Sequence, residues 1–445
     1  MLSRADDPLR TCALALALGG VLIALPVAAQ QRPALPTPES TDPVALQLMQ
    51  GFPPPPEKTV RLATVLRYPN ARWAFHHMRE LGPTVAVWRG PGPASALPQS
   101  LREIDSIRFD DGQGRALSVQ EWQRATYTDA LLVLHRGRVV HESYAAGMKS
   151  WQPHALWSVS KSLTGLLATQ LIHEGRLQPA ATIASYLPEL KESAWGDATV
   201  QQALDMTAGV QYSEDFADPA SGIFQYLVAG GLLPSPASQP PARGVPAYLP
   251  TVQKAGAHGA GFQYKTVDAE VIGWLLQRVT GQSLADLLSE RLWKPLGAGE
   301  DGYIWVDGGG AQLASVGVGA SARDLARLGE MLRLQGRFNG RQVVAAEVVA
   351  ELRKGADREK FLAAGQAMRA GYSYHNFWWI PHDADDSFEA KGLNGQHLHI
   401  NPAAEVVIVK FSSHPVPNTA FTHLLDRQAF AAIARGLRQV RGTGP

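Results

Sequence analysis

The order in which strand-like and helix-like apolar patterns follow one another is the strongest constraint on the fold of this chain. Short apolar runs interrupted by a turn predict one hairpin at 131–140 and another at 397–411. Apolar residues at helical spacing dominate the region from about 180 to 300, and a last helix is predicted at 422–435. Strands early and late, with helices between them, predict an α/β sheet domain with helices on both faces and a helical insertion.

The N-terminus has the features of an export signal. Two arginines precede an apolar run from Cys12 to Val27, and Ala28 and Ala29 follow it as a small-residue cleavage pattern. We expect residues 1–29 to be a cleaved signal peptide and the protein to be exported, either to the periplasm or out of the cell. The alternative is an uncleaved membrane anchor, but glycines and Pro26 interrupt the run. No later apolar segment has spanning length, so we expect no stable membrane association after cleavage.

A Pro-rich stretch at 30–58 follows the apolar run. Its composition is typical of an extended, weakly ordered tether. We assign the folded domain to 59–440, with the helical insertion at about 180–300. The sequence leaves the oligomeric state open.

Composition excludes several classes of function. The net charge is +1 and no run of Lys and Arg stands out, so we predict no nucleic-acid partner. Cys12 is the single cysteine and lies in the signal segment, so the mature chain has no disulfide, thiol nucleophile or cysteine zinc ligand. His397 and His399 share one strand face, but no third ligand accompanies them. We therefore predict no metal and no cofactor.

The tetrapeptide Ser158-Val159-Ser160-Lys161 carries the main indication of chemistry. It opens a strongly apolar helix, and positions i and i+3 of a helix lie on one face, so the Ser158 hydroxyl and the Lys161 amine can touch. Burial makes a lysine lose its charge readily, and a neutral amine can take the serine proton. A Ser-x-x-Lys spacing alone is weak, because a capping serine followed by a solvated lysine is the commoner case.

Two further stretches can contribute to the same chemistry. Tyr264 precedes a predicted helix, and a phenol beside a buried lysine can pass a proton to a leaving group. Gly392 lies at the edge of the late strand pair, where glycine allows a backbone to approach a ligand closely. Taken alone, each stretch is also consistent with an ordinary helix entrance or a Gly-rich turn.

Together, in this order, the three stretches resemble the serine β-lactamase and penicillin-binding-protein family in a class C-like form. The family pattern is Ser-x-x-Lys, then Tyr-x-Asn (or Ser/Thr), then a Lys/His-Thr-Gly strand, and the likeness extends over roughly 55–440. Further sequence segments look closest to the branch of nylon-oligomer (6-aminohexanoate-dimer) hydrolases and related esterases. These segments are Gly51-Phe52-Pro53-Pro54-Pro55-Pro56, Trp73 to Leu81, Leu204-Asp205-Met206-Thr207, Ser213-Glu214-Asp215 and Gly395-Gln396.

The resemblance implies a β-lactamase/transpeptidase-like fold, with an antiparallel sheet flanked by helices and an inserted all-helical domain. It also implies a role for each matched residue. Ser158 would be the acylated nucleophile, Lys161 its base and Tyr264 the proton shuttle. Thr266 would touch the substrate amide, Gly392 would match the strand glycine, and the Leu393 N–H would join that of Ser158 in an oxyanion hole.

One departure from the family pattern bears on substrate choice. Aligned on Gly392, the Lys/His-Thr pair reads Ala390-Lys391, so the cation that helps to hold a β-lactam carboxylate is missing. Lys391 is the remaining candidate for substrate binding on this strand. A regular strand would turn it to the opposite face, and there it would not substitute. The departure argues against efficient β-lactam hydrolysis and against peptidoglycan carboxypeptidase activity.

The sequence therefore predicts a serine hydrolase that cleaves small-molecule linear amides or carboxylic esters through an acyl-enzyme on Ser158. A β-lactamase or D-Ala-D-Ala carboxypeptidase is the alternative within the same family. A non-catalytic binding or sensor module with the same fold is the alternative of another class, as is a purely structural exported protein. The natural substrate and its acyl chain stay open, because the pocket is built from loops.

Overall fold

We describe a computed structural model in residues 35–235, 243–365, 369–417 and 420–439. The chain divides into two compact units, Met1–Leu35 and Pro36–Pro445. The predicted signal peptide lies outside the described residues. No helix in the described ranges combines the length and the apolar character that crossing a membrane requires.

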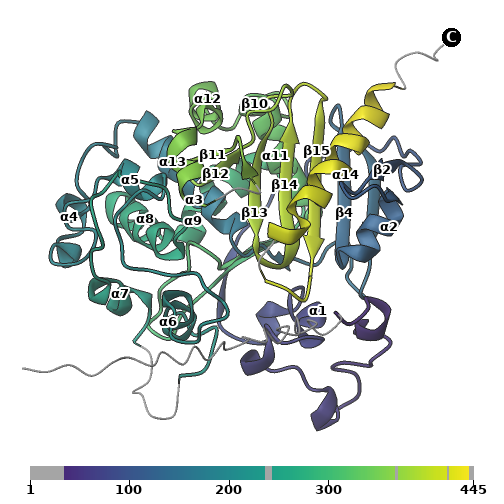
Figure 1. Cartoon of the computed structure of the whole chain (residues 1–445), viewed down its shortest axis with the longest axis horizontal. Coiled ribbons are helices and arrows are strands. Elements are labelled where there is room, and N and C mark those ends of the chain that lie inside the picture. Colours follow the sequence, from purple (N-terminus) through teal and green to yellow (C-terminus); the bar gives the residue numbers. More distant parts are fainter. Residues whose placement is uncertain (1–34, 236–242, 366–368, 418–419, 440–445) are drawn as a thin grey trace, which may run out of the picture. The chain divides into compact units, whose positions relative to one another are not determined.

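A seven-stranded antiparallel sheet forms the centre of the second unit (Figure 1). It contains both predicted hairpins, and the early and late strands meet where β4 pairs with β15. In spatial order the strands are β11 (Ser373–His375), β12 (Trp378–Ile380), β13 (Phe388–Gly392), β14 (Gln396–Asn401), β15 (Val406–Ser412), β4 (Thr128–His135) and β5 (Arg138–Tyr144).

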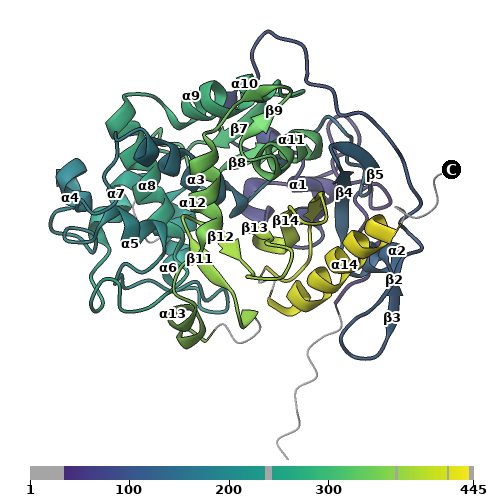
Figure 2. The same cartoon turned by 90° about the horizontal axis from the view of Figure 1, so that it is seen from above.

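Strands β4 and β15 are apolar on both faces, which explains why they contain continuous apolar runs and no alternation of polar and apolar residues. In β4, Leu131 and Val133 belong to one core cluster, whereas Leu132 and Leu134 belong to the other. Successive side chains of a strand point to opposite faces, so each cluster marks one face of the sheet. Helices α11 (Ala322–Arg333) and α14 (Ala420–Gln439) cover the two faces, as Figures 1 and 2 show.

The predicted insertion is helical, and between 180 and 300 the described residues contain no strand. Helix α3 (Val159–His173) packs against α8 (Thr266–Thr280) in this part of the molecule. The other helices here are α4 (Ile183–Tyr186), α5 (Val200–Leu204), α6 (Gly222–Ala229), α7 (Val245–Tyr248), α9 (Leu284–Leu288) and α10 (Lys294–Leu296).

Smaller elements complete the unit. A four-stranded sheet contains β1 (Thr84–Val87), β7 (Gly302–Trp305), β8 (Val318–Ala320) and β6 (His154–Ala155), in that order. Two-stranded pairs are β2 (Arg108–Asp110) with β3 (Ala116–Ser118), and β9 (Arg337–Phe338) with β10 (Arg341–Gln342). The remaining helices are α1 (Asn70–Ala74), α2 (Val119–Ala125), α12 (Ala346–Lys354) and α13 (Arg358–Ala363).

The described part of the Pro-rich lead-in is more ordered than its composition suggests. Residues 36–58 fold with the large unit and contain two short 3-10 turns. Thr41 and Leu48 are buried, and Leu48 joins the main apolar core. Burial of these two side chains fixes the segment in place, whereas its Pro-rich composition alone predicts an extended chain.

Candidate active site

Five of the predicted residues line one pocket of about 220 Å³. They come from the start of α3, from the loop before α8 and from the end of β13, which lie far apart in sequence. The lining is Ser158, Glu214, Phe216, Tyr264, Arg369, Trp379, Lys391, Gly392, Leu393 and Pro417. Lys161 reaches Ser158 from the first turn of α3, and Thr266 lies next to the lining without belonging to it.

Ser158 and Lys161 are in direct contact. Ser158 occupies the N-cap of α3, and the Nζ of Lys161 lies 2.9 Å from its Oγ. The same Nζ lies 3.3 Å from the backbone carbonyl oxygen of Ser315. Lys161 is fully buried, whereas Ser158 keeps part of its surface in the pocket. A hydroxyl that can meet a substrate is thus paired with an amine that water does not reach.

Lys161 differs from the other buried lysines of the described chain in lacking an ion pair. Each of the other three has a carboxylate oxygen within 4 Å: Lys265 with Asp268 at 3.8 Å, Lys391 with Glu389 at 2.5 Å and Lys410 with Asp426 at 3.3 Å. Burial lowers the pKa of Lys161 to about 8, against the opposing field of Glu214 and Glu270. An amine with such a pKa is partly neutral near pH 7 to 8 and can act as a base.

A buried carboxyl group fixes the carbonyl that contacts Lys161. Glu270 accepts hydrogen bonds from the backbone N–H groups of Ala314 and Ser315, both at 3.0 Å, and from the Ser315 hydroxyl at 2.5 Å. Tyr226 donates to the same carboxyl group at 2.7 Å. These bonds hold the turn at Ser315 and therefore the acceptor that orients the Lys161 amine.

Tyr264 lies against both members of the Ser158–Lys161 pair. The Nζ of Lys161 is 5.2 Å from the centroid of the Tyr264 ring. Burial raises the pKa of Tyr264, and its hydrogen bond with Ser158 opposes that rise. The phenol therefore keeps its proton at neutral pH and is a donor, not a phenolate base. Trp379 stacks on the ring, with centroids 5.6 Å apart and planes at 21°, and fixes its orientation.

The backbone before Ser158 is held in a strained conformation close to β13. Trp157 has a φ of 47°, in the left-handed region that non-glycine residues seldom adopt. A Cβ added to Gly392 would lie 2.5 Å from the carbonyl oxygen of Leu156. Glycine is therefore required at 392, because it lets the end of β13 approach the segment that carries Ser158. This contact brings Leu393 into the pocket.

Thr266 lies beside the pocket lining and is in contact with Glu214. It is buried at the first turn of α8, and its backbone N–H donates to Oε1 of Glu214 at 2.6 Å. Burial raises the pKa of Glu214, while Lys161 and the bonds from Thr266 oppose that shift. Thr266 thus holds a carboxyl group that lines the pocket. Sequence reasoning used Glu214 only as part of the family likeness.

Lys391 lies at the pocket edge, but its ammonium group is in contact with two other side chains. Its Nζ is 2.5 Å from Oε2 of Glu389 and 3.2 Å from Nδ1 of His423. Strand periodicity places Lys391 and Glu389 on one face of β13 and Ala390 on the other. Lys391 is therefore turned away from the face that carries Ala390, as a regular strand requires.

Sequence reasoning did not identify Arg369, Trp379, Phe216 or Pro417 as lining residues. Arg369 is half-buried, and its guanidinium carbon lies 4.8 Å from the centroid of the Trp379 ring. No local pattern marks these residues, because they reach the pocket only through the packing of loops. The aromatic pair at 378–379 was the single available signal.

The two histidines weighed as metal ligands have separate carboxylate partners. His397 Nε2 lies 3.2 Å from Asp426, and His399 Nδ1 lies 2.9 Å from Glu389. Within the described residues, no three His, Cys, Asp or Glu side chains gather in a way that could hold a metal ion.

Comparisons with known proteins give a consistent result. The family described as Beta-lactamase matches residues 111–433. The 6-aminohexanoate-dimer hydrolase of Paenarthrobacter ureafaciens is 36% identical over 374 residues, which cover 84% of this chain and 93% of that protein. A solved structure named "Putative 6-aminohexanoate-dimer hydrolase from Bacillus anthracis" superposes with a TM-score of 0.80 at 31% identity, covering 87% of this chain and 99% of its own. A penicillin-binding-protein homologue from Caulobacter crescentus shares the fold, with a TM-score of 0.51 at 18% identity over 71% of this chain and 96% of its own.

Proposed function

The chain belongs to the beta-lactamase family, and from this we propose that it is a serine hydrolase cleaving linear amides or carboxylic esters through an acyl-enzyme on Ser158. The observation that carries the proposal is the contact of 2.9 Å between Ser158 Oγ and the Nζ of Lys161, a buried lysine that has no ion pair among the described residues. The chain is 36% identical to an enzyme named 6-aminohexanoate-dimer hydrolase, so a short linear amide of this type is the first substrate to test.

Acylation begins with proton transfer within the Ser158–Lys161 pair. The neutral Lys161 amine takes the hydroxyl proton as Oγ attacks the carbonyl carbon of the substrate. Burial lowers the pKa of Lys161 to about 8, so a substantial part of the amine is neutral under mildly alkaline conditions. The Ser315 carbonyl stays within reach of Nζ and keeps the ammonium that forms beside the reaction centre.

The tetrahedral intermediate then needs a site for its oxyanion and a proton for its leaving group. We assign the oxyanion to the backbone N–H groups of Ser158 and Leu393, since Gly392 lets the end of β13 approach α3. Tyr264 keeps its proton because burial raises its pKa, and it passes that proton to the departing amine or alcohol. Lys161 replaces the proton on Tyr264. Water releases the acyl group by the reverse sequence, and the mechanism uses no cofactor.

We further propose that the protein acts outside the cytoplasm on small-molecule substrates. This proposal rests on the signal-like segment 1–29. Mass spectrometry of the N-terminus of protein exported by its host would test the cleavage after Ala29. A chain that still carries residues 1–29 would contradict export by cleavage.

The test of the catalytic proposal compares the mature protein with its Ser158→Ala variant. The substrates are a p-nitrophenyl ester with a short acyl chain, the 6-aminohexanoate dimer and nitrocefin. We expect the ester or the dimer to be turned over by the parent protein only. Nitrocefin turnover should be slow, because Ala390 lacks a charge and the Lys391 charge is paired with Glu389.

The other outcomes separate the remaining functions. Fast turnover of nitrocefin would favour a β-lactamase. A single burst of product equal to the enzyme concentration, without turnover, would favour a sensor that is acylated once. Hydrolysis that survives Ser158→Ala would contradict the mechanism.

A further inference from the structure

We propose that the carboxylate of Glu270 is a remote counter-charge for the Lys161 ammonium, and that it sets the pH range in which the enzyme is active. This inference rests on the proposed function and deepens it, because it assigns a positioning residue to the base of the same site. Glu270 is buried and does not line the Ser158 pocket, so it acts on Lys161 and not on the substrate.

Ser315 lies between the two charged groups. Its carbonyl oxygen is 3.3 Å from the Nζ of Lys161. Its backbone N–H and its hydroxyl both donate to Oε1 of Glu270, at 3.0 Å and 2.5 Å. Because these groups belong to one residue, the carboxylate oxygen is at most about 10 Å from the amine. Two opposite charges at that distance in a protein interior change the protonation equilibrium of either group about tenfold.

The turn that carries Ser315 is held by three helices. Thr164 of α3 donates to the carbonyl oxygen of Ala314 at 2.9 Å. The Ala314 N–H donates to Oε2 of Glu270, which belongs to α8, at 3.0 Å. Tyr226 of α6 donates to Glu270 at 2.7 Å and lies 2.9 Å from the Ser315 hydroxyl. The distance between the carboxylate and the amine is therefore fixed by the packing of these helices.

The hydrogen bonds around Glu270 favour its ionised form. Four groups donate to its two oxygens: the N–H groups of Ala314 and Ser315, the Ser315 hydroxyl and the Tyr226 hydroxyl. A carboxylate only accepts hydrogen bonds, so it fits this set of donors without a proton of its own. Burial raises the pKa of Glu270, and these hydrogen bonds oppose that rise. Among the described residues Glu270 forms no ion pair, so no cation in contact with it cancels its charge.

Burial lowers the pKa of Lys161, and two carboxyl groups oppose that shift, Glu214 and Glu270. Glu214 lines the pocket, where a bound substrate changes its surroundings, whereas Glu270 keeps the same buried surroundings throughout the reaction. The other ionisable groups that face Lys161 or Glu270 are tyrosines whose pKa values are raised by burial: Tyr212, Tyr226 and Tyr264. These tyrosines stay uncharged at neutral pH, so Glu270 is the constant negative charge near the base.

The test measures the pH profile of kcat/KM for Glu270→Gln, with the substrate that the parent protein hydrolyses in the Ser158→Ala test. The variant removes the charge but keeps the size of the side chain and an acceptor oxygen. In the parent, kcat/KM falls as the pH drops below the Lys161 pKa of about 8. Without the carboxylate this pKa is lower, so the acidic limb should move to lower pH by about one pH unit. A merely structural role would lower kcat/KM without moving the limb.

Further variants separate charge from folding. Glu270→Asp keeps the charge and should keep the acidic limb near its parent position, even where kcat falls. Should Glu270→Gln not fold, Tyr226→Phe is measured instead. It removes one donor, so the carboxyl group carries less negative charge at a given pH, and the limb should move in the same direction by a smaller amount.

Asp307→Asn is the matched control. Asp307 is also buried, and its carboxylate accepts hydrogen bonds from three backbone N–H groups outside the turn at Ser315, those of Val245 at 2.6 Å, Gly309 at 2.8 Å and Ala311 at 2.9 Å. This variant should keep the acidic limb of the parent.

Two results would overturn the inference while leaving the proposed function intact, provided that hydrolysis still depends on Ser158. One is an acidic limb that stays in place in Glu270→Gln, or in Tyr226→Phe where the first variant does not fold. The other is a limb that moves equally in Asp307→Asn, because loss of any buried carboxylate would then have the same effect. Loss of the Ser158 dependence itself would instead overturn the proposed function, and this inference with it.

Discussion

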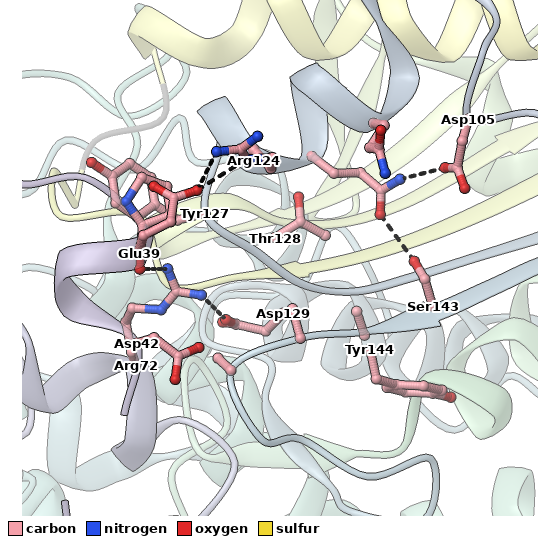
Figure 3. A pocket seen from close by; sticks show the side chains of 16 residues that line it. Glu39, Asp42, Arg72, Asp105, Arg124, Tyr127, Thr128, Asp129, Ser143 and Tyr144 are labelled. Carbon is pink, nitrogen blue, oxygen red and sulfur yellow. Dashed lines mark hydrogen bonds and ion pairs between the residues drawn. The ribbon is translucent and has the colours of Figure 1, made fainter. Parts of the chain in front are cut away.

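The Ser158 pocket and a second pocket around Arg72 differ in how their buried charges are compensated. The Arg72 pocket is the larger, at about 320 Å³, and lies between the lead-in, α2 and the edge of the sheet (Figure 3). There the Arg72 guanidinium lies 3.3 Å from the carboxylate of Asp129, and both side chains are buried. Arg124 pairs with Glu39 at 2.6 Å across the same pocket. Beside the Ser158 pocket, Lys161 has no such partner in the part of the chain that the structure describes.

Ser143 and Asp105 of the Arg72 pocket lining lie near His141, which does not line the pocket; these are residue types that catalysis uses, but without the geometry. Ser143 Oγ lies 3.1 Å from Nε2 of His141, and Asp105 is 3.8 Å from that same nitrogen. A catalytic triad needs the carboxylate on the other ring nitrogen, where it can orient the histidine toward the serine. We therefore propose that the chemistry is located by a base without an ion pair in contact with a reachable hydroxyl, and not by pocket size or residue type.

The largest expected effect comes from removing the uncompensated charge. Lys161→Met should lower kcat/KM by about 10³-fold, because Ser158 loses its base. The free energy of unfolding should stay the same or rise, since methionine fills a similar volume without a buried amine. Ester hydrolysis and urea denaturation measure the two quantities. Activity within tenfold of the parent would show that Lys161 is not the base.

The matched change in the other pocket should have the opposite character. Arg72→Met leaves the Asp129 carboxylate buried without its main partner and should lower the free energy of unfolding by about 3–5 kcal/mol. The kcat/KM of the folded protein should not change. The double variant Arg72→Met/Asp129→Leu should recover most of the loss in a urea titration. A loss below about 1 kcal/mol in the single variant would contradict this view of the ion pair.

A smaller effect is expected from adding a side-chain atom where β13 approaches the segment before Ser158. Gly392→Ala places a Cβ 2.5 Å from the Leu156 carbonyl, so the strand must move away. We expect kcat to fall by about 10²-fold, the usual cost of one misplaced oxyanion donor. Ala390→Gly, on the same strand, is the control and should cost less activity. Equal kcat values for Gly392→Ala and the parent would argue against an oxyanion donor at Leu393.

The smallest expected change is the dependence of kcat/KM on pH, taken per pH unit. The active form requires neutral Lys161, and burial lowers its pKa to about 8, so kcat/KM should rise about tenfold per pH unit below that value and level off above it. The free energy of unfolding should also rise with pH. Between about pH 8 and 10.5 the unfolded chain binds the proton that the folded protein has lost, so the free energy of unfolding gains a term that rises with pH. That term should be missing in Lys161→Met. A pH profile that is flat from 6 to 9 would contradict the assignment.

Local interactions allowed the sequence to predict most elements and the core of the site. The two hairpins, the helix after Ser158 and the helix after Tyr264 follow from apolar periodicity and turn residues, which act over a few residues. The contact of Ser158 with Lys161 follows from one turn of helix. The antiparallel sheet and the meeting of the three motifs followed only from the family resemblance, since pairing of distant strands leaves no local trace.

Tertiary structure decided what surrounds the nucleophile. Arg369, Trp379 and Glu214 reach the pocket through loops whose course depends on packing, and Thr266 turned out to hold Glu214 beside the pocket lining. The lead-in 36–58 joins the folded unit because Leu48 finds an apolar partner surface that composition cannot reveal. The sequence alone thus determined that the side chains of Ser158 and Lys161 meet, because one turn of helix sets that contact. Which substrate they meet was decided by the fold, because side chains separated by more than a hundred residues become neighbours only when the core is packed.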